Sequence, residues 1–369
     1  MKLAGFNKTA NAKIFRWIFL LAAPLLLFGS AGCGSGKTTK ATRGRQKKNE
    51  KKVDEKKNTD RGSHFEWQMR NPDLILEDPY DPVFDVCFSP DGKYMAAASK
   101  NEIDVWDVNT GKKKQQIEVE GSASWIDISP NGKWVACGNS LCEFDPEKNA
   151  RDLEFHDLPF TVGDALFCPD NATMVGSDLR QVFLILIHDR NKVKVVQEDP
   201  LALHYCLGIS PDGRFLAVGS LGQDAVCIRE MGSFSLLQKV ELGKGALSIC
   251  FFPDNGRILV GGVDKTAKIF DVSLGDYRKS RLIRSFEEHL ERVTTVAVSF
   301  TGTVVATGSA DRSISIWDPE TGKIVHDLAG HKNGVSSVVF HPTGKYLASG
   351  SADQTARIWA LPKECWPRK

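Results

Sequence analysis

Residues 31–38 are the stretch of this chain that fits a phosphate-binding pattern. Their sequence, Ala-Gly-Cys-Gly-Ser-Gly-Lys-Thr, matches a relaxed loop in which backbone N–H groups at a helix N-terminus hold phosphates and a lysine neutralises them. The flanking sequence does not support that chemistry, because an apolar signal-like stretch precedes the loop where a core strand is required. The residues that follow lack the apolar period of a packed helix. We therefore predict no nucleotide and no other cofactor here.

The histidines and cysteines lack the spacing of metal sites. No histidine pair shows the i, i+4 arrangement with glutamate, and no cysteine pair shows CxxC spacing, so we predict no metal ion. Cys137 and Cys142 flank a short polar stretch. They either face each other across a hairpin as a disulfide or fill the core as two small hydrophobic residues.

Nothing in the sequence indicates a catalytic group. A nucleophilic serine or cysteine needs a positioned base, and no such pairing is visible. The paired carboxylates Glu287-Glu288 and Glu118/Glu120 are interpreted as solvated surface residues. We predict a protein that is not an enzyme and has no catalytic residues.

The first 33 residues predict an export signal. Four cations precede the apolar stretch Trp17–Phe28, whose twelve residues are too few to cross a bilayer core of about 30 Å. The next residues, Ser30-Ala31-Gly32-Cys33, resemble a bacterial lipoprotein processing site, although serine stands where leucine is usual. We predict a lipidated Cys33 and a membrane-anchored protein of the bacterial cell envelope. An uncleaved signal anchor is the alternative, and the basic residues after Cys33 leave the side of the membrane open.

Residues 34–65 are predicted to be a disordered basic linker. Between residues 34 and 62, eleven basic residues stand against four acidic ones. From residue 63 onward, 33 basic residues face 42 acidic ones, a net charge of −9. Because phosphate contacts need clustered Lys and Arg, we predict no nucleic-acid partner for this acidic body.

A repeated turn organises the rest of the chain. Seven copies of a Ser-Pro-Asp-Gly-like turn recur at a mean spacing of 42 residues, beginning with Ser89-Pro90-Asp91-Gly92 and ending with His341-Pro342-Thr343-Gly344. Each follows an alternating apolar run, so each marks a strand that enters a hairpin. Four short strands in each repeat predict radial blades, because one such sheet buries its faces only against its neighbours.

The last two repeats resemble WD repeats, and residues 66–369 resemble a seven-bladed WD-repeat propeller. The dipeptides Trp106-Asp107 and Trp317-Asp318 and the pair Gly330-His331 carry the resemblance. The fold expected is all-β, with seven four-stranded antiparallel blades, preceded by a signal helix and the disordered linker. The resemblance also implies buried tetrads of His, Ser or Thr, Asp and Trp. Carried over, these are His331, Ser349, Asp353 and Trp359 in blade seven and His289, Thr307, Asp311 and Trp317 in blade six.

Ring closure requires a strand from the other end of the chain. The sequence ends soon after Trp359, before a fourth strand of the last blade, and an open edge would expose unpaired backbone groups. We predict that Leu74-Ile75-Leu76 pairs beside residues 355–359.

The resemblance implies a non-catalytic protein-interaction scaffold, tethered to a membrane, that binds proteins or peptides through its loops. We expect contacts near Arg292 and Asn333, on the loops before the inner strands. A second candidate surface is the basic insertion between blades five and six, with Arg278, Lys279 and Arg281. The alternative is a ligand-binding or enzymatic propeller with its site in the central channel. A third hypothesis is a regulatory module of an envelope complex, which differs from the scaffold only in its partner.

Overall fold

The computed structural model describes residues 73–77, 81–158, 162–178, 181–187, 189–198, 205–273 and 280–366. The chain divides into two units, Met1–Glu66 and Trp67–Lys369, and all described residues belong to the second. The predicted signal segment 1–33, with Cys33, and the predicted linker 34–65 lie outside the described residues. No helix within the described ranges has the length and apolar character needed to span a membrane.

Short-range hydrogen bonds explain why each repeated turn ends a strand. In the first copy, Ser89 Oγ donates to Asp91 Oδ1 (2.6 Å) and accepts from the backbone N–H of Tyr94 (3.0 Å). Gly92 adopts a φ of 72°, which glycine accepts without the steric cost that a side chain would bring. The turn therefore stops the inner strand and starts the second strand in a fixed register.

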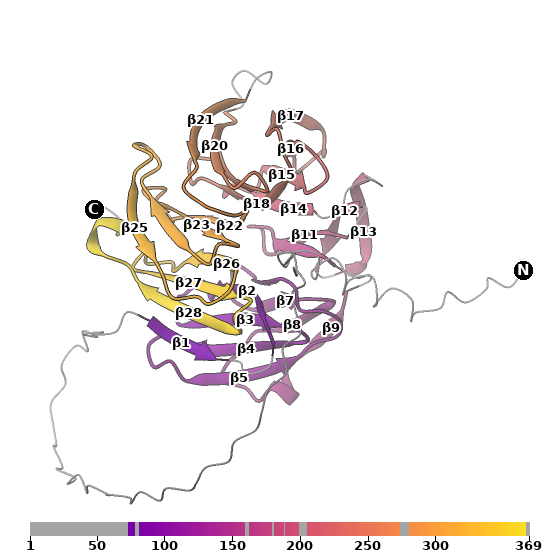
Figure 1. Cartoon of the computed structure of the whole chain (residues 1–369). Helices are drawn as coiled ribbons and strands as arrows, with labels where there is room; N and C mark the ends of the chain where they lie inside the picture. The colour runs from indigo at the N-terminus through magenta and orange to yellow at the C-terminus, as the bar shows by residue number, and fades with distance from the viewer. Residues whose placement is uncertain are drawn as a thin grey trace, which may run out of the picture. The chain divides into compact units, whose positions relative to one another are not determined.

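Seven antiparallel sheets follow from these turns, each with four strands (Figure 1). Blade one contains β2 (Val83–Phe88), β3 (Tyr94–Ser99), β4 (Glu102–Asp107) and β5 (Lys113–Glu118). Blade two contains β6 (Ile126–Ile128), β7 (Trp134–Cys137), β8 (Ser140–Glu143) and β9 (Phe155–Asp157), with the 3-10 turn η1 (Ala150–Asp152). Blade three contains β10 (Asp164–Phe167), β11 (Thr173–Ser177), β12 (Gln181–Leu186) and β13 (Asp189–Glu198).

The second half of the chain repeats the pattern. Blade four contains β14 (Tyr205–Ile209), β15 (Phe215–Ser220), β16 (Ala225–Glu230) and β17 (Leu236–Glu241). Blade five contains β18 (Ala246–Phe251), β19 (Arg257–Gly262), β20 (Ala267–Asp271) and β21 (Arg281–Phe286). Blade six contains β22 (Val293–Val298), β23 (Val305–Ser309), β24 (Ile314–Trp317) and β25 (Ile324–Leu328). Blade seven contains β26 (Val335–Phe340), β27 (Tyr346–Ser351) and β28 (Thr355–Ala360), and the 3-10 turn η2 (Lys363–Cys365) follows.

The fourth strand of blade seven comes from the start of the propeller. Strand β1 (Asp73–Glu77) pairs antiparallel with β28, with Leu74 opposite Ile358, which confirms the predicted closure. Figure 1 shows this indigo strand beside the yellow end of the chain. Contacts join each inner strand to the next, and β26 contacts β2, so the structure is the predicted seven-bladed propeller.

The core lies between neighbouring blades. Ile103 and Val105 of blade one share a buried cluster with Ile126 and Val135 of blade two, and similar clusters recur around the ring. We call the end where the inner strands begin the upper face; it also carries the turns between second and third strands. The end where the inner strands finish is the lower face, with the repeated turns and the turns between third and fourth strands.

Candidate functional site

The four tetrad residues of blade seven lie together. His331, in the loop before β26, places Nε2 at 2.7 Å from Ser349 Oγ on β27 and Nδ1 at 2.9 Å from Asp353 Oδ2 in the next turn. Trp359 Nε1, on β28, donates to the same serine oxygen at 2.8 Å. The four side chains form one hydrogen-bonded chain, and this satisfies each buried polar atom in it.

Blade six repeats this chain. His289 Nε2 lies 2.7 Å from Thr307 Oγ1, and its Nδ1 lies 3.0 Å from Asp311 Oδ2. Trp317 Nε1 donates to Thr307 Oγ1 at 2.8 Å. A fifth member that the sequence reasoning missed is Ser313, which donates to Asp311 Oδ1 at 2.5 Å. Its equivalent in blade seven is Thr355.

The carboxylate of blade seven is held in its charged form. Burial acts to raise the pKa of Asp353, but hydrogen bonds from Thr355, from the Lys332 N–H and from His331 outweigh it and lower that pKa to about 2. Burial lowers the pKa of His331, against the opposing effect of Asp353, so the imidazole is neutral near pH 7. Asp311 also has a lowered pKa, because hydrogen bonds, chiefly from Ser313, outweigh its burial.

The tetrad carboxylates also fix the upper-face loops. Asp353 Oδ2 accepts the backbone N–H of Lys332 at 2.7 Å, and Asp311 Oδ2 accepts that of Leu290 at 2.9 Å. Lys265 Nζ donates to the Leu290 carbonyl at 2.7 Å. Leu290 is nevertheless 75% exposed. The fold therefore holds the backbone of an apolar residue in place while presenting its side chain to solvent.

Two of the predicted contact residues lie on this face. Asn333 is exposed, and its Oδ1 accepts the N–H of Gly334 at 2.8 Å. Arg292 is half-buried, and its carbonyl accepts from Ser309 Oγ at 3.0 Å. Leu290 was missed because a single exposed leucine carries no distinguishing pattern in a sequence.

Arg281, the described member of the predicted basic surface, does not lie with them. Arg281 begins β21 at the lower face and pairs with Asp271 at 3.4 Å, with 76% of its side chain exposed. Arg278 and Lys279 lie outside the described residues. The structure thus separates Arg281 from Arg292 and Asn333.

Three aspartates stand on successive inner strands of blades one to three. Asp85 Oδ2 on β2 accepts the Ile126 N–H of blade two at 2.9 Å, and Asp127 Oδ2 on β6 accepts the Phe167 N–H of blade three at 2.8 Å. Asp164 on β10 accepts backbone N–H groups in the same way. Burial raises the pKa of Asp85 to about 6 and those of Asp127 and Asp164 to about 7. The sequence analysis assigned no role to these three carboxylates.

Hydroxyl groups take the same role on the other side of the ring. Ser248 Oγ accepts the Val296 N–H and Thr295 Oγ1 accepts the Val338 N–H, each at 3.1 Å. The aspartates of the inner strands β2, β6 and β10 are therefore acceptors that join one blade to the next. Their oxygens are engaged by backbone, which does not favour a ligand site there.

The described cysteines are free thiols. Cys137 and Cys142 are both buried, and Cys142 lies opposite Val135 rather than opposite Cys137. Burial raises the pKa of Cys142 to about 12, so its thiolate is not available as a nucleophile near neutral pH. Within the described ranges, no group of three or more His, Cys, Asp or Glu side chains is arranged to hold a metal ion.

A comparison with known protein families agrees with the propeller geometry. Residues 72–107, 239–271, 280–318 and 322–360 match the model of the WD domain, G-beta repeat. These four stretches are therefore similar to WD40 repeats. Each repeat begins near an outer strand and ends with the third strand of the following blade, so the sequence repeat is offset by one strand from the structural blade. The matched model indicates a repeat and no catalytic family.

Individual relatives are similar to this chain over 42% to 66% of its length. The chain is 28% identical to WD repeat-containing protein 18 of Danio rerio over 62% of its length and 58% of the relative's length. It is 26% identical to the guanine nucleotide-binding protein subunit beta of Schizosaccharomyces pombe over 66% of its length and 94% of the relative's length. It is 27% identical to THO complex subunit 3 of Arabidopsis thaliana over 42% of its own length and 54% of the relative's length.

Proposed function

We propose that the protein is a non-catalytic interaction scaffold that binds a partner protein through the upper face of its WD40 repeats and is tethered to a membrane by its N-terminal segment. The exposed Leu290, whose backbone is fixed by Asp311 and Lys265, is the observation that carries the proposal. A buried tetrad next to an exposed apolar side chain is an arrangement suited to binding. Because the backbone of the loop at Leu290 is already fixed, a partner gains an apolar contact without the entropic cost of ordering that loop.

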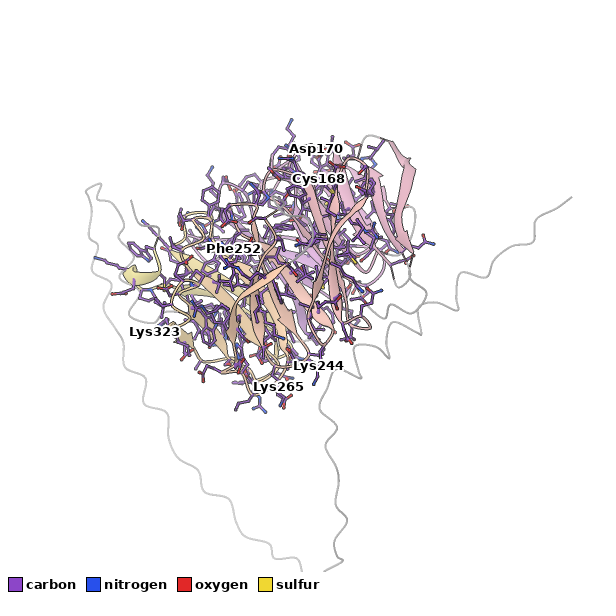
Figure 2. All side chains as sticks on the ribbon, turned by 90° about the horizontal axis from the view of Figure 1, so that it is seen from above. Cys168, Asp170, Lys244, Phe252, Lys265 and Lys323 are labelled. Atoms are coloured by element: carbon purple, nitrogen blue, oxygen red, sulfur yellow. The ribbon has the colours of Figure 1, made fainter. Side chains whose placement is uncertain are left out.

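The residues around Leu290 suit a partner with mixed charge. Lys332, Asn333 and Arg312 are exposed on the same face, as is Glu291 beside Leu290. Figure 2 shows Lys244 and Lys265, which belong to upper-face loops, at the edge of the propeller away from Cys168 and Asp170, which belong to a lower-face turn. The relatives include a guanine nucleotide-binding protein subunit beta and THO complex subunit 3, both named as subunits of larger assemblies, and this supports a scaffold role.

A pair of photo-crosslinking variants tests the upper face. Leu290 and Phe300 are 75% and 78% exposed and lie beyond opposite ends of β22, so they are matched in exposure and differ in face. A photoreactive amino acid at position 290 should capture one defined partner in the native cells, while the same group at position 300 should not capture it. Equal capture from both positions, or none from position 290, would reject the upper face as the binding surface.

The membrane tether is tested separately. The proposal rests on the lipoprotein-like residues that end at Cys33. A Cys33→Ser variant should move from the membrane fraction to the soluble fraction, with unchanged partner capture through position 290 in detergent extracts. Retention in the membrane fraction would reject lipidation and favour an uncleaved anchor instead.

A further inference from the structure

In blades one and five, a side chain at one repeated position bridges to the next blade on the lower face. Four residues after the turn proline, blade one places Tyr94, whose hydroxyl donates to Glu147 Oε1 of blade two at 2.7 Å. Blade five places Arg257 at the same position, and its Nη1 lies 2.7 Å from Glu320 Oε1 of blade six. Both glutamates lie in the turn between the third and fourth strands of the next blade.

The environment of Arg257 shows what such a cleft holds. Its guanidinium lies 4.4 Å from the ring centre of Phe252, the residue before the turn proline. Its Nε donates to Asp254 Oδ2 of the same turn at 2.6 Å. An apolar floor and two carboxylates, those of Asp254 and Glu320, therefore surround one arginine head group.

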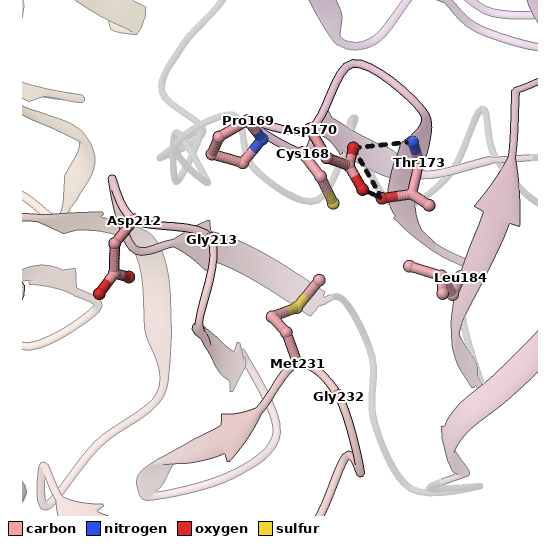
Figure 3. A pocket seen from close by; sticks show the side chains of 9 residues that line it. All are labelled: Cys168, Pro169, Asp170, Thr173, Leu184, Asp212, Gly213, Met231 and Gly232. Carbon is pink, nitrogen blue, oxygen red and sulfur yellow. Dashed lines mark hydrogen bonds between the residues drawn. The ribbon is translucent and has the colours of Figure 1, made fainter.

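Blade three has a short side chain at this position. Thr173 takes the place of Arg257, and its hydroxyl turns back to Asp170 Oδ2 at 2.9 Å. A cleft of about 470 Å³ lies between blades three and four (Figure 3). Cys168 occupies the place of Phe252 at its floor and is 3% exposed, and Asp170 occupies the place of Asp254.

The other lining residues make this cleft acidic and apolar. Leu184 and Met231 form walls from the two blades, and Asp212 adds a second carboxylate from the turn of blade four. Asp170 and Asp212 are both exposed to solvent. Among the described residues that line the cleft, none is a cation.

The geometry points to a binding site for an arginine side chain of a partner protein in this cleft, in the place that Arg257 fills between blades five and six. The methylene stem would lie on Met231 and Leu184, and the planar guanidinium would reach the carboxylate of Asp170. The side chain of Asp212 turns away from Asp170 in Figure 3 and would add negative charge at the rim of the cleft. An acidic side chain would be repelled by the same carboxylates. The proposal does not depend on the upper face, because the two surfaces lie at opposite ends of the strands.

Disulfide capture of small probes tests the site. A Cβ atom added at Gly232, beside the cleft, meets nothing within 4 Å, so a Gly232→Cys variant offers a thiol there without a clash. The probes are disulfides of equal length that end in a guanidinium, an alkyl group or a carboxylate. Intact mass, corrected for the native thiols with the wild-type protein, should show guanidinium captured about three- to tenfold over alkyl. The carboxylate probe should be captured least.

Two further variants make the result specific. Lys323→Cys places a thiol in the corresponding turn of blade six, which also carries Glu320, the partner of Arg257, and should show no guanidinium preference. Adding Thr173→Arg to Gly232→Cys should fill the cleft from within and abolish the preference. Should Gly232→Cys fail to fold by circular dichroism, the exposed neighbour Ser233 serves as the thiol site. Equal capture of guanidinium and alkyl probes, or a preference that survives Thr173→Arg, would overturn the proposal.

Discussion

Replacing Asp353 by asparagine should destabilise the propeller in a way that depends on pH. Its side chain is 4% exposed, and hydrogen bonds from Thr355, Lys332 and His331 lower its pKa from 3.8 to about 2 against the effect of burial. At about 1.4 kcal/mol for each pH unit, this difference corresponds to about 2 kcal/mol of stability. Because the folded-state pKa is the lower one, the contribution is complete above pH 4 and is lost as the pH falls toward 2.

Urea unfolding followed by tryptophan fluorescence measures this effect. Asp353→Asn should lower the free energy of unfolding by about 2 kcal/mol at pH 7, and about half of that difference should remain at pH 3. Glu118→Gln, an exposed change on β5, is the control and should alter the free energy by less than about 0.5 kcal/mol. An unchanged stability at pH 7, or a loss of the same size at both pH values, would refute the reasoning.

Three other changes test separate parts of the fold. Trp359→Phe removes the donor to Ser349 and should lower the free energy of unfolding by about 1 to 3 kcal/mol in the same urea assay; an unchanged midpoint would contradict the role of the tetrad. Deleting residues 63–78 removes β1 and should replace one cooperative melting transition by a broad one in calorimetry, whereas an unaltered melting curve would count against closure. Burial raises the pKa of Asp127 to about 7, so its contribution to stability is lost as the pH rises from about 4 to 7. Asp127→Asn should therefore flatten the fall in melting temperature over that range, and a parallel fall in both proteins would refute this.

The fold was predictable because its signals are local. The repeated turn is encoded within five residues, such as Ser89 to Lys93, whose hydrogen bonds form regardless of the rest of the chain. The closing strand was predictable because the last blade lacked a fourth strand. The tetrad residues that the structure brings together were accessible only through the WD-repeat resemblance, because His331 and Asp353 are 22 residues apart.

The rest of the surface depends on contacts between blades, which no local pattern records. Asp85 lies in a strand whose other residues are apolar. The backbone N–H that donates to its carboxylate belongs to Ile126, which is 41 residues away in the sequence. The cleft at Thr173 is visible only when that residue is compared with Arg257 in the folded ring. Arg281 was grouped with Arg278 and Lys279 by sequence, but the direction of β21 puts it at the lower face.

The pairing of β1 with β28 has a consequence for biogenesis. The first of the described strands, β1, is synthesised long before its partner, so its backbone stays without its final neighbour until Thr355–Ala360 has been synthesised. An incomplete chain that lacks β28 therefore has two strand edges without their final partners. Premature termination before residue 355 would leave both edges open to pairing with another molecule.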